Sequence, residues 1–282
     1  MPLIDTHCHL AAEQFDADRE EVAARSLAAG VGIVAAATDL PSSRLNLELA
    51  AGHRGIASAV GVHPTETAGL DDAAWKEVSR LAASPLVSAI GETGLDYYWK
   101  NVSPAVQAKW FDRHIELALS VGKPLLVHAR DSVLDVMERL KPALASGLAA
   151  VWHCFSASRR DLRPAFDFAV AEGVWMAVGG MATFADRKSL RAAIPLIPDR
   201  LLLLETDAPY LPPHPKLTDR NEPVRLIRVA EAVAELRGQE LSRLAEITVG
   251  NAKRLFPALA GWAGAAAAVP DRREAWKEAF TD

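Results

Sequence analysis

Two histidines, His7 and His9, stand two residues apart near the start of the chain, in the stretch IDTHCHL (residues 4–10). In an extended strand, side chains two apart point to the same side, so both imidazoles would face one point while Cys8 faces away. Two imidazoles aimed at one point are typical of a metal site, although a single HxH also occurs by chance in surface loops. From this pair alone both interpretations stay open.

Further polar residues stand where other apolar runs end. They are His63 in VGVHPTE, Glu92 in SAIGETG, His128 in PLLVHARD, His153 in VWHCFS and Asp207 in LLLLETDAP. Taken singly, each could be a packed core histidine or an acid that caps a turn. Taken together they predict one site, because the C-terminal ends of parallel barrel strands meet at one rim. Neutral imidazoles with two carboxylates would hold one or two divalent cations there.

The elements that must position these residues alternate along the chain. Short apolar runs alternate with amphipathic stretches of helical length, and this pattern favours βαβ units with a parallel sheet. The strand candidates cover residues 2–5, 31–37, 55–62, 86–92, 124–129, 148–155, 173–180 and 200–207. Eight strands, each followed by a helix, predict an α/β fold of the TIM type, a (β/α)8 barrel, and two further helical patterns at 223–238 and 240–256 predict extra C-terminal helices.

The composition is that of a globular protein without a general attraction to polyanions. The 282 residues are 50% hydrophobic and 24% charged, with a formal net charge of -5. The two cysteines are too few for a disulfide framework, and neither a signal peptide nor an apolar run of membrane-spanning length is recognisable. We expect a single-domain cytoplasmic protein with no membrane partner, with residues 1–257 forming the barrel and residues 258–282 an Ala-rich segment and a peripheral helical tail.

The motifs resemble those of the TatD-related deoxyribonucleases, within the metal-dependent hydrolase superfamily. The matching segments run in family order from Ile4 to Phe256: DTHCHL, GVHP, GETGLDYY, HARD, HCFS, LLLETDAPYL, RNEP and NAKRLF. Residues 212–220 depart from the family pattern. We expect that departure to affect DNA preference, affinity and strand polarity rather than the metal chemistry.

The resemblance implies a two-metal site and a role for each residue. His7, His9 and Asp207 would bind one ion and His128 and His153 the other, with Glu92 bridging both. His63 would face the substrate phosphate. Asp207, Glu92 and His63 would thus be the catalytic residues, and Asp207 would orient a water molecule and take its proton. The implied activity is 3′-5′ hydrolysis of DNA, so DNA 3′ ends are the expected partner, and no protein partner is inferred.

The donor types bear on which ions these are. Mg²⁺ is the usual activating ion implied by the resemblance, yet it prefers oxygen ligands, whereas four histidines favour Zn²⁺ or Mn²⁺. We expect Mg²⁺ or Mn²⁺ to support activity and regard Zn²⁺ as the alternative in purified protein.

Other residues carry weaker expectations. Arg130, Asp96 and Tyr97 follow the strand ends closely and are candidates for substrate binding, although a solvated charged face is the more frequent role of such an arginine. Strand alternation turns Cys8 and Cys154 away from the neighbouring histidines, which favours packing over ligation.

Two other functions remain open from the sequence. The same ions could polarise a carbonyl group, which would make the protein an amidohydrolase or an esterase, for example one that cleaves aminoacyl esters. Many amidohydrolases bridge their metals with a carboxylated lysine after the fourth strand, and Glu92 occupies that place here, which favours the nuclease. A binding protein without turnover would be favoured by missing ligands, and none is missing.

Overall fold

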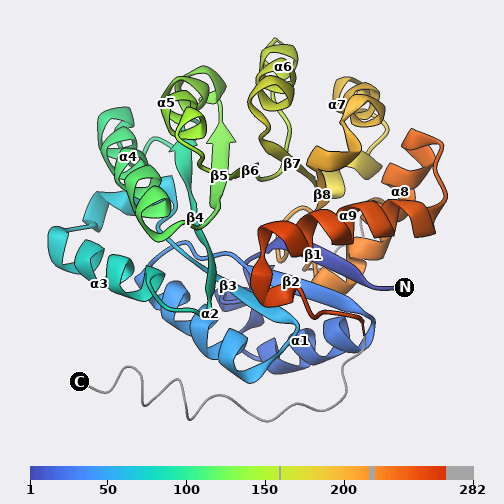
Figure 1. Cartoon of the computed structure of the whole chain (residues 1–282), viewed down its shortest axis with the longest axis horizontal. Helices are drawn as coiled ribbons and strands as arrows, with labels where there is room; N and C mark the ends of the chain where they lie inside the picture. The colour runs from blue at the N-terminus through green and yellow to red at the C-terminus, as the bar shows by residue number, and fades with distance from the viewer. Residues whose placement is uncertain (159, 216–219, 265–282) are drawn as a thin grey trace.

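Eight parallel strands in chain order form the centre of the molecule (Figure 1), which confirms the predicted (β/α)8 barrel. The structure is a computed structural model that describes residues 1–158, 160–215 and 220–264. The strands are β1 (Leu3–Cys8), β2 (Val31–Ala35), β3 (Ile56–Val60), β4 (Val87–Asp96), β5 (Leu125–Arg130), β6 (Ala150–Trp152), β7 (Trp175–Val178) and β8 (Leu202–Leu204).

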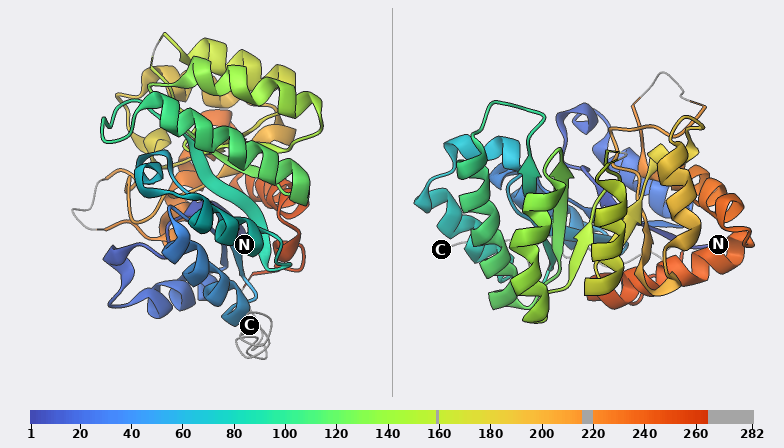
Figure 2. Two further views of the ribbon diagram at one scale, coloured as in Figure 1. Left: turned by 90° about the vertical axis from the view of Figure 1, so that its left-hand side faces the viewer. Right: turned by 90° about the horizontal axis from the view of Figure 1, so that it is seen from above.

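Helices surround these strands on the outside (Figures 1 and 2). They are α1 (Arg19–Ala28), α2 (Leu40–Gly52), α3 (Asp72–Ala82), α4 (Pro104–Val121), α5 (Val133–Ala145), α6 (Leu162–Glu172), α7 (Lys188–Ala193), α8 (Leu226–Arg237) and α9 (Leu241–Leu255). Local sequence explains their ends. In α4, Ser103 caps the first turn, Pro104 fits the first helical position, and Gly122 stops the helix in a left-handed conformation with φ of 65°.

The first and last strands meet through residues that lie at their C-terminal ends. The amide of Asp207 donates to the carbonyl of His7 at 3.0 Å, and the amide of His9 donates to the carbonyl of Ala208 at 2.7 Å. The Thr6 hydroxyl also donates to the carbonyl of Leu204 at 3.0 Å. These hydrogen bonds join β1 to the segment that follows β8 and place Asp207 beside His7 and His9.

Helix α9 covers the N-terminal mouth of the barrel and leaves the opposite mouth for the site. Every strand contributes to the apolar cluster beneath it, through Ile4, Val34, Ala57, Ala89, Leu126, Val151, Ala177 and Leu203. Phe256 and Trp262 complete this cluster, and the indole N–H of Trp262 donates to the carbonyl of Leu3 at 3.3 Å. The N-terminal mouth is therefore packed core.

The C-terminal part of the chain is only partly described. Trp262 lies beyond the predicted boundary at residue 257 and packs against Gly32 and Gly55. That boundary stays a prediction, and the predicted tail helix at 271–280 lies outside the described residues. Within the described ranges, no helix has the length and apolarity needed to cross a lipid bilayer.

Candidate metal centre

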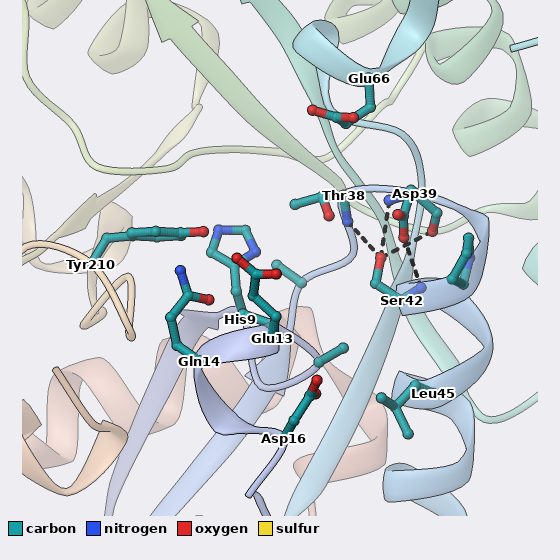
Figure 3. Close-up of a pocket in the computed structure, with 14 residues that line it drawn as sticks. His9, Glu13, Gln14, Asp16, Thr38, Asp39, Ser42, Leu45, Glu66 and Tyr210 are labelled. Carbon is teal, nitrogen blue, oxygen red and sulfur yellow. Dashed lines mark hydrogen bonds between the residues drawn. The ribbon is translucent and has the colours of Figure 1, made fainter. Parts of the chain in front are cut away.

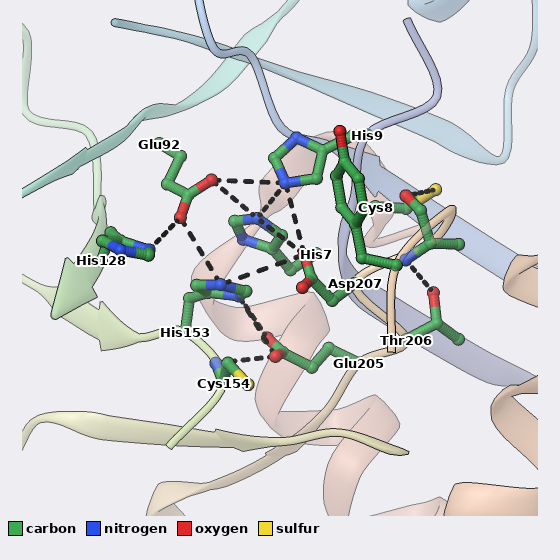
Figure 4. Close-up of polar contacts among 12 residues, drawn as sticks. His7, Cys8, His9, Glu92, His128, His153, Cys154, Glu205, Thr206 and Asp207 are labelled. Carbon is green, nitrogen blue, oxygen red and sulfur yellow. Dashed lines mark hydrogen bonds and ion pairs between the residues drawn. The ribbon is translucent and has the colours of Figure 1, made fainter. Parts of the chain in front are cut away.

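His7 and His9 bring their outer ring nitrogens together at the end of β1. The two Nε2 atoms are 3.3 Å apart, and both side chains are buried. Cys8, between them, faces the other way into an apolar cluster with Leu10 and Phe15. The alternation expected from the sequence thus places both imidazoles on one side (Figure 4).

Glu92, on β4, lies between two groups of imidazoles (Figure 4). Its Oε2 is 3.3 Å from Nε2 of His7 and 3.3 Å from Nε2 of His9. Its Oε1 is 2.9 Å from Nδ1 of His128 and 3.5 Å from Nε2 of His153. The carboxylate is 2% exposed, so each oxygen faces a different pair of nitrogens in a region shielded from water.

Asp207 completes the side of His7 and His9. Its Oδ1 lies 3.3 Å from Nε2 of His9, 3.9 Å from Nε2 of His7 and 4.0 Å from Nε2 of His153. The residue has a φ of 58°, in the left-handed region that few side chains other than glycine adopt. Such strain is often stored at functional sites, and here it accompanies a carboxylate aimed at three imidazoles.

The donor atoms fit a divalent cation. The donor atoms are Nε2 of His7, Nε2 of His9, Oε2 of Glu92 and Oδ1 of Asp207. The five distances between them that involve a histidine nitrogen are 3.3 to 3.9 Å. A tetrahedral ion with ligands at about 2.1 Å would space its ligands about 3.4 Å apart. Three sets of described residues gather donor atoms within 4.8 Å of one another: His7, His9 and Asp207; His7, His153 and Glu205; and His63, Glu92 and His128.

Burial and mutual attraction shift the ionisation of these groups in different directions. Burial opposes the charge on Glu92, but the imidazoles of His153 and His7 outweigh it and hold its pKa well below the usual range. The pKa of Asp207 is also lowered, because nearby His153 and His9 offset the effect of burial. Burial lowers the pKa of His7 to about 4. Both carboxylates are therefore ionised at neutral pH, as metal ligands must be.

His63 follows β3 and points its Nε2 towards Glu92 Oε1 at 3.8 Å. Its Nδ1 lies 3.3 Å from the amide nitrogen of Thr65 and 2.7 Å from the hydroxyl oxygen of the same residue, so Thr65 holds the ring in place. Burial lowers the pKa of His63 to about 3, so the ring is neutral at pH 7. The side chain thus presents its Nε2 at the edge of the cluster.

The three weaker candidates lie in different surroundings. Asp96 is 1% exposed, and its Oδ2 is 3.0 Å from Nε2 of His128. The half-buried Tyr97 donates its hydroxyl to Asp135 at 2.7 Å, and the exposed Arg130 stacks its guanidinium over the ring of Tyr98. Roles of all three in substrate binding stay predictions, and Asp96 touches the histidine cluster directly.

Glu205 is the residue of the cluster that the sequence analysis did not single out. It is fully buried, and its carboxylate lies 3.1 Å from Nδ1 of His153. Burial disfavours the charge on His153, but Glu205 and the carboxylates of Glu92 and Asp207 raise the pKa of its imidazole to about 10. A signal was present, because Glu205 stands two residues before Asp207, the same spacing that links His7 and His9.

A cavity of about 550 Å³ opens beside His9 (Figure 3). Loops that follow β1 and β2 supply most of its wall, together with Glu66 and Tyr210. Four acidic side chains line it: Glu13, Asp16, Asp39 and Glu66. The 14 described lining residues include no lysine or arginine. The cavity would repel a phosphate group and attract a cationic or hydrogen-bond-donating group.

Comparisons with known proteins agree with this geometry. The chain is 38% identical over 257 residues, which cover 90% of this chain and 98% of the relative, to the "Uncharacterized metal-dependent hydrolase YabD" of Bacillus subtilis strain 168. It is 36% identical over 260 residues, 90% of this chain and 97% of the relative, to the "3'-5' ssDNA/RNA exonuclease TatD" of Musicola paradisiaca strain Ech703. The crystal structure of YjjV, a TatD homolog from Escherichia coli K12, superposes with a TM-score of 0.83 at 29% identity, over 90% of this chain and 98% of that one.

The barrel, the cluster of imidazoles and carboxylates at its C-terminal rim and these relatives define an enzyme, a metal-dependent hydrolase. The match extends to a family. The model of the TatD related DNase family covers residues 4–257, which is most of the chain, and the chain belongs to that family.

Proposed function

We propose that the protein is a 3′-5′ deoxyribonuclease that hydrolyses phosphodiester bonds at a centre of two divalent ions. The observation that carries this proposal is the position of Glu92, which presents one oxygen to His7 and His9 and the other to His128 and His153. Two sites joined by one carboxylate suit in-line displacement at phosphorus, in which both the attacking and the leaving oxygen carry charge.

The chain's own residues divide into two ligand groups. His7, His9 and Asp207 would hold one ion, His128 and His153 would hold the other, and Glu92 would contribute to both sites. The chemistry that such ions supply when bound is activation of water and neutralisation of charge on the phosphate and leaving oxygens. The protein keeps the carboxylates of Glu92 and Asp207 ionised for this purpose, whereas His153, whose pKa the surrounding carboxylates raise, would release its proton on binding an ion.

Two residues act on the substrate side. Asp207 is ionised and held by its strained backbone, so it can orient the attacking water and take its proton. His63 presents Nε2 to the cluster, and with its ring proton on that nitrogen it would donate a hydrogen bond to a phosphate oxygen. Such a donor stabilises the charge that accumulates as the bond breaks.

The donor set and the family resemblance both bear on which ions the site would bind. Histidine nitrogens predominate among the proposed ligands, which favours Mn²⁺ or Zn²⁺ over Mg²⁺. We propose Mn²⁺ or Mg²⁺ as the activating ion and Zn²⁺ as the ion that purified protein retains.

One observation favours a second candidate function. The cavity beside His9 is acidic, and its described lining residues include no lysine or arginine, so it suits the amino group of an aminoacyl ester better than a second phosphate. An esterase acting on such substrates would use the same ligands, with the ions polarising a carbonyl oxygen. The nuclease remains the first proposal because a nuclease-named relative is 36% identical over 90% of this chain.

The test uses full-length protein stripped with a chelator and reconstituted separately with Mg²⁺, Mn²⁺ or Zn²⁺. The substrates are single-stranded and duplex DNA labelled at the 5′ end, and the variants are Glu92→Gln and, as a matched control, Glu222→Gln. Glu222 binds Arg25 and Arg220 and does not touch the histidine cluster. We expect a ladder of progressively shorter labelled products, dependent on metal, in wild type and Glu222→Gln but not in Glu92→Gln.

Two results would contradict the proposal. DNA cleavage that persists in the Glu92→Gln protein would show that the chemistry lies elsewhere. Bound metal without DNA cleavage under any condition would remove the nuclease assignment and leave the site, and hydrolysis of an aminoacyl ester by the same samples would then establish the second candidate.

A further inference from the structure

Three aromatic side chains are exposed in the described part of the chain, and all three follow strand ends at the C-terminal rim of the barrel. Tyr98 and Trp99, which are 50% and 55% exposed, follow β4, and Tyr210, which is 47% exposed, follows β8. Tyr210 belongs to the wall of the acidic cavity beside His9. Tyr98 and Trp99 lie together on another loop, with their ring centroids 5.1 Å apart. Exposed aromatic rings grouped beside a candidate active site indicate a binding surface.

A cation lies against these two rings. The guanidinium carbon of Arg130, on β5, is 3.8 Å from the centre of the Tyr98 ring, and this arginine forms no ion pair with a described residue. The ring of Trp99 stands at 90° to that of Tyr98, and more than half of the side chain is exposed. The three side chains, here called the aromatic patch, thus present an aromatic ring beside an unpaired positive charge. This combination is the one that binds single-stranded nucleic acid.

One carboxylate connects the aromatic patch to the candidate metal centre. Oδ1 of Asp96 accepts hydrogen bonds from the amides of Tyr98 at 2.9 Å and Trp99 at 3.0 Å. Oδ2 of the same residue lies 3.0 Å from Nε2 of His128. Because Asp96 is 1% exposed, water does not replace these contacts. The patch is therefore held beside the centre before a substrate binds, which lowers the entropic cost of binding.

The two sides of the rim differ in charge. On the side of β1 and β2, the cavity beside His9 is lined by four acidic side chains and by no lysine or arginine among its described residues. On the side of β4 and β5, Arg130 and Lys100 are exposed, and the neighbouring Asp135 accepts the hydroxyl of Tyr97. A phosphate backbone is repelled on the first side, whereas Arg130 can bind it on the second. A nucleic acid strand at the centre therefore has one favourable path across the rim.

We propose that the aromatic patch binds the part of a single DNA strand that lies on the 5′ side of the scissile phosphate. Trp99 stacks on a base, and Arg130, held against the ring of Tyr98, binds a backbone phosphate. The inference rests on the proposed function, because in 3′-5′ hydrolysis the rest of the strand lies on that side and must cross the rim. It adds a preference for single strands, since bases paired in a duplex cannot stack on the indole.

The test separates stacking from charge by comparing two labelled strands. One is an ordinary single strand of about 12 nucleotides, a length within the range that single-strand binding sites cover. The other has the same length but carries abasic sites throughout, so that it keeps every phosphate and loses every base. Binding to the full-length protein is measured by fluorescence anisotropy with a chelator present, so that neither strand is hydrolysed. Thermal unfolding of each sample identifies any variant that fails to fold.

We expect Trp99→Ala to weaken the binding of the ordinary strand by about 10-fold and to leave that of the abasic strand unchanged, because one stacked base is lost. Trp99→Phe should retain most of the affinity, whereas Trp99→Leu should not, since a leucine has no π face on which a base can stack. Leu196→Ala is the matched control. Leu196 is 68% exposed and precedes β8, at the opposite mouth of the barrel, so its loss should change neither affinity.

We expect Arg130→Gln to weaken the binding of both strands alike. It should also reduce the slope of log affinity against log salt concentration by about 0.7, the value for one phosphate contact on a single strand. Arg243→Gln is the matched control, because Arg243 lies on α9, which covers the opposite mouth, and pairs with Glu246 there. Its affinities and salt dependence should equal those of wild type.

Several results would overturn the inference. They are no measurable binding of the ordinary strand by wild type, wild-type affinity in a folded Trp99→Ala protein, or an equal loss of affinity for the ordinary and the abasic strand in that variant. An unchanged salt dependence in Arg130→Gln would overturn the phosphate contact. Binding as expected, without cleavage once Mn²⁺ is restored, would contradict the nuclease proposal alone.

Discussion

The side chain of His63 is the neutral imidazole to which we assign a contact with the substrate phosphate. Thr65 holds its Nδ1, burial keeps the ring uncharged, and Nε2 points towards Glu92. A donor held in advance at the place where a phosphate oxygen gains charge lowers the barrier without paying for reorganisation.

We expect His63→Ala to lower the rate of DNA hydrolysis by roughly 100-fold while the protein retains its metal, because the lost group is a hydrogen-bond donor and not a ligand. Turnover is measured with the labelled DNA, and metal content is measured by elemental analysis of the same sample. A loss of metal together with the rate would mean that His63 is a ligand, as its place in one of the three donor sets would allow.

At the scale of residues, the sequence predicted which side chains meet at the rim better than it predicted their hydrogen-bond partners. The spacing of His7 and His9 and the apolar runs before Glu92 and Asp207 pointed to the residues that meet at the rim. The contacts of Glu205 and Asp96 were not foreseen, because a hydrogen bond to the far side of an imidazole depends on the register between strands. That register is set by tertiary packing and not by local spacing.

Among the elements, the pairing of β4 with β5 decides whether Glu92 reaches His128. Gly94 pairs with His128 across these strands and has a φ of 142°. A Cβ atom there would lie 2.0 Å from the carbonyl oxygen of His128, so only glycine allows this approach.

Gly94→Ala should therefore force the two strands apart and lower the free energy of unfolding by about 3 kcal/mol, because it adds a clash and an unfavourable backbone conformation. The measurement is urea unfolding. Gly250→Ala is the control, since the added methyl group meets no described atom within 4 Å apart from its chain neighbours and the backbone of its own helix, and it should not destabilise the protein. Equal stability of the Gly94→Ala protein and wild type would show that the strands can separate freely.

Helix α4 is joined to the end of β3 by a buried histidine. Nδ1 of His114 donates to the carbonyl of Trp110 at 2.7 Å, and its Nε2 accepts from the amide of Val62 at 3.0 Å, next to His63. Burial lowers the pKa of His114 from 6.5 to about 4. The neutral ring thus holds the segment that carries a proposed catalytic residue.

The stability of the protein should fall as the pH is lowered from about 6.5 to about 4. In that range the unfolded chain binds a proton at His114 and the folded protein does not, so His114 contributes a loss of roughly 3 kcal/mol in the free energy of unfolding, with no further change at lower pH. Urea unfolding of chelator-treated wild type and His114→Gln at several pH values isolates this contribution. Parallel pH curves for the two proteins would contradict it.

For the whole molecule, one mouth of the barrel carries the candidate site and the other is closed by core packing. Strand ends and loops at the C-terminal mouth carry the metal centre, whereas α9 and Trp262 close the N-terminal mouth with apolar packing. Trp262 is 4% exposed and contacts Gly32 and Gly55. This division is common in TIM barrels, where conserved function and stability lie at opposite ends.

We expect Trp262→Ala to lower the free energy of unfolding by about 3 to 5 kcal/mol, because it leaves a large cavity in the core. The activity per folded molecule should stay near that of wild type. Trp99→Ala, at a tryptophan that is 55% exposed, is the control for stability. A loss of activity greater than the loss of folded protein would show that the two mouths are coupled.

The fold of the whole molecule was predictable because the signal is repeated. All eight expected strands are present, since each apolar run ends in turn residues and is followed by a helix of sufficient length. The closure of the N-terminal mouth by Trp262 was not predictable. A tryptophan in an Ala- and Gly-rich segment (residues 258–268) gives no periodic signal, and the glycines that leave room for its ring, Gly32 and Gly55, are far away in the sequence.

The measurement that tests the central claim most directly is anomalous diffraction from crystals of the full-length protein grown with Mn²⁺. We expect two anomalous peaks at the C-terminal rim, one among His7, His9 and Asp207 and the other beside His128 and His153, with Glu92 between them. A single peak, or two peaks without Glu92 in contact with both, would contradict a centre in which this carboxylate joins two ions.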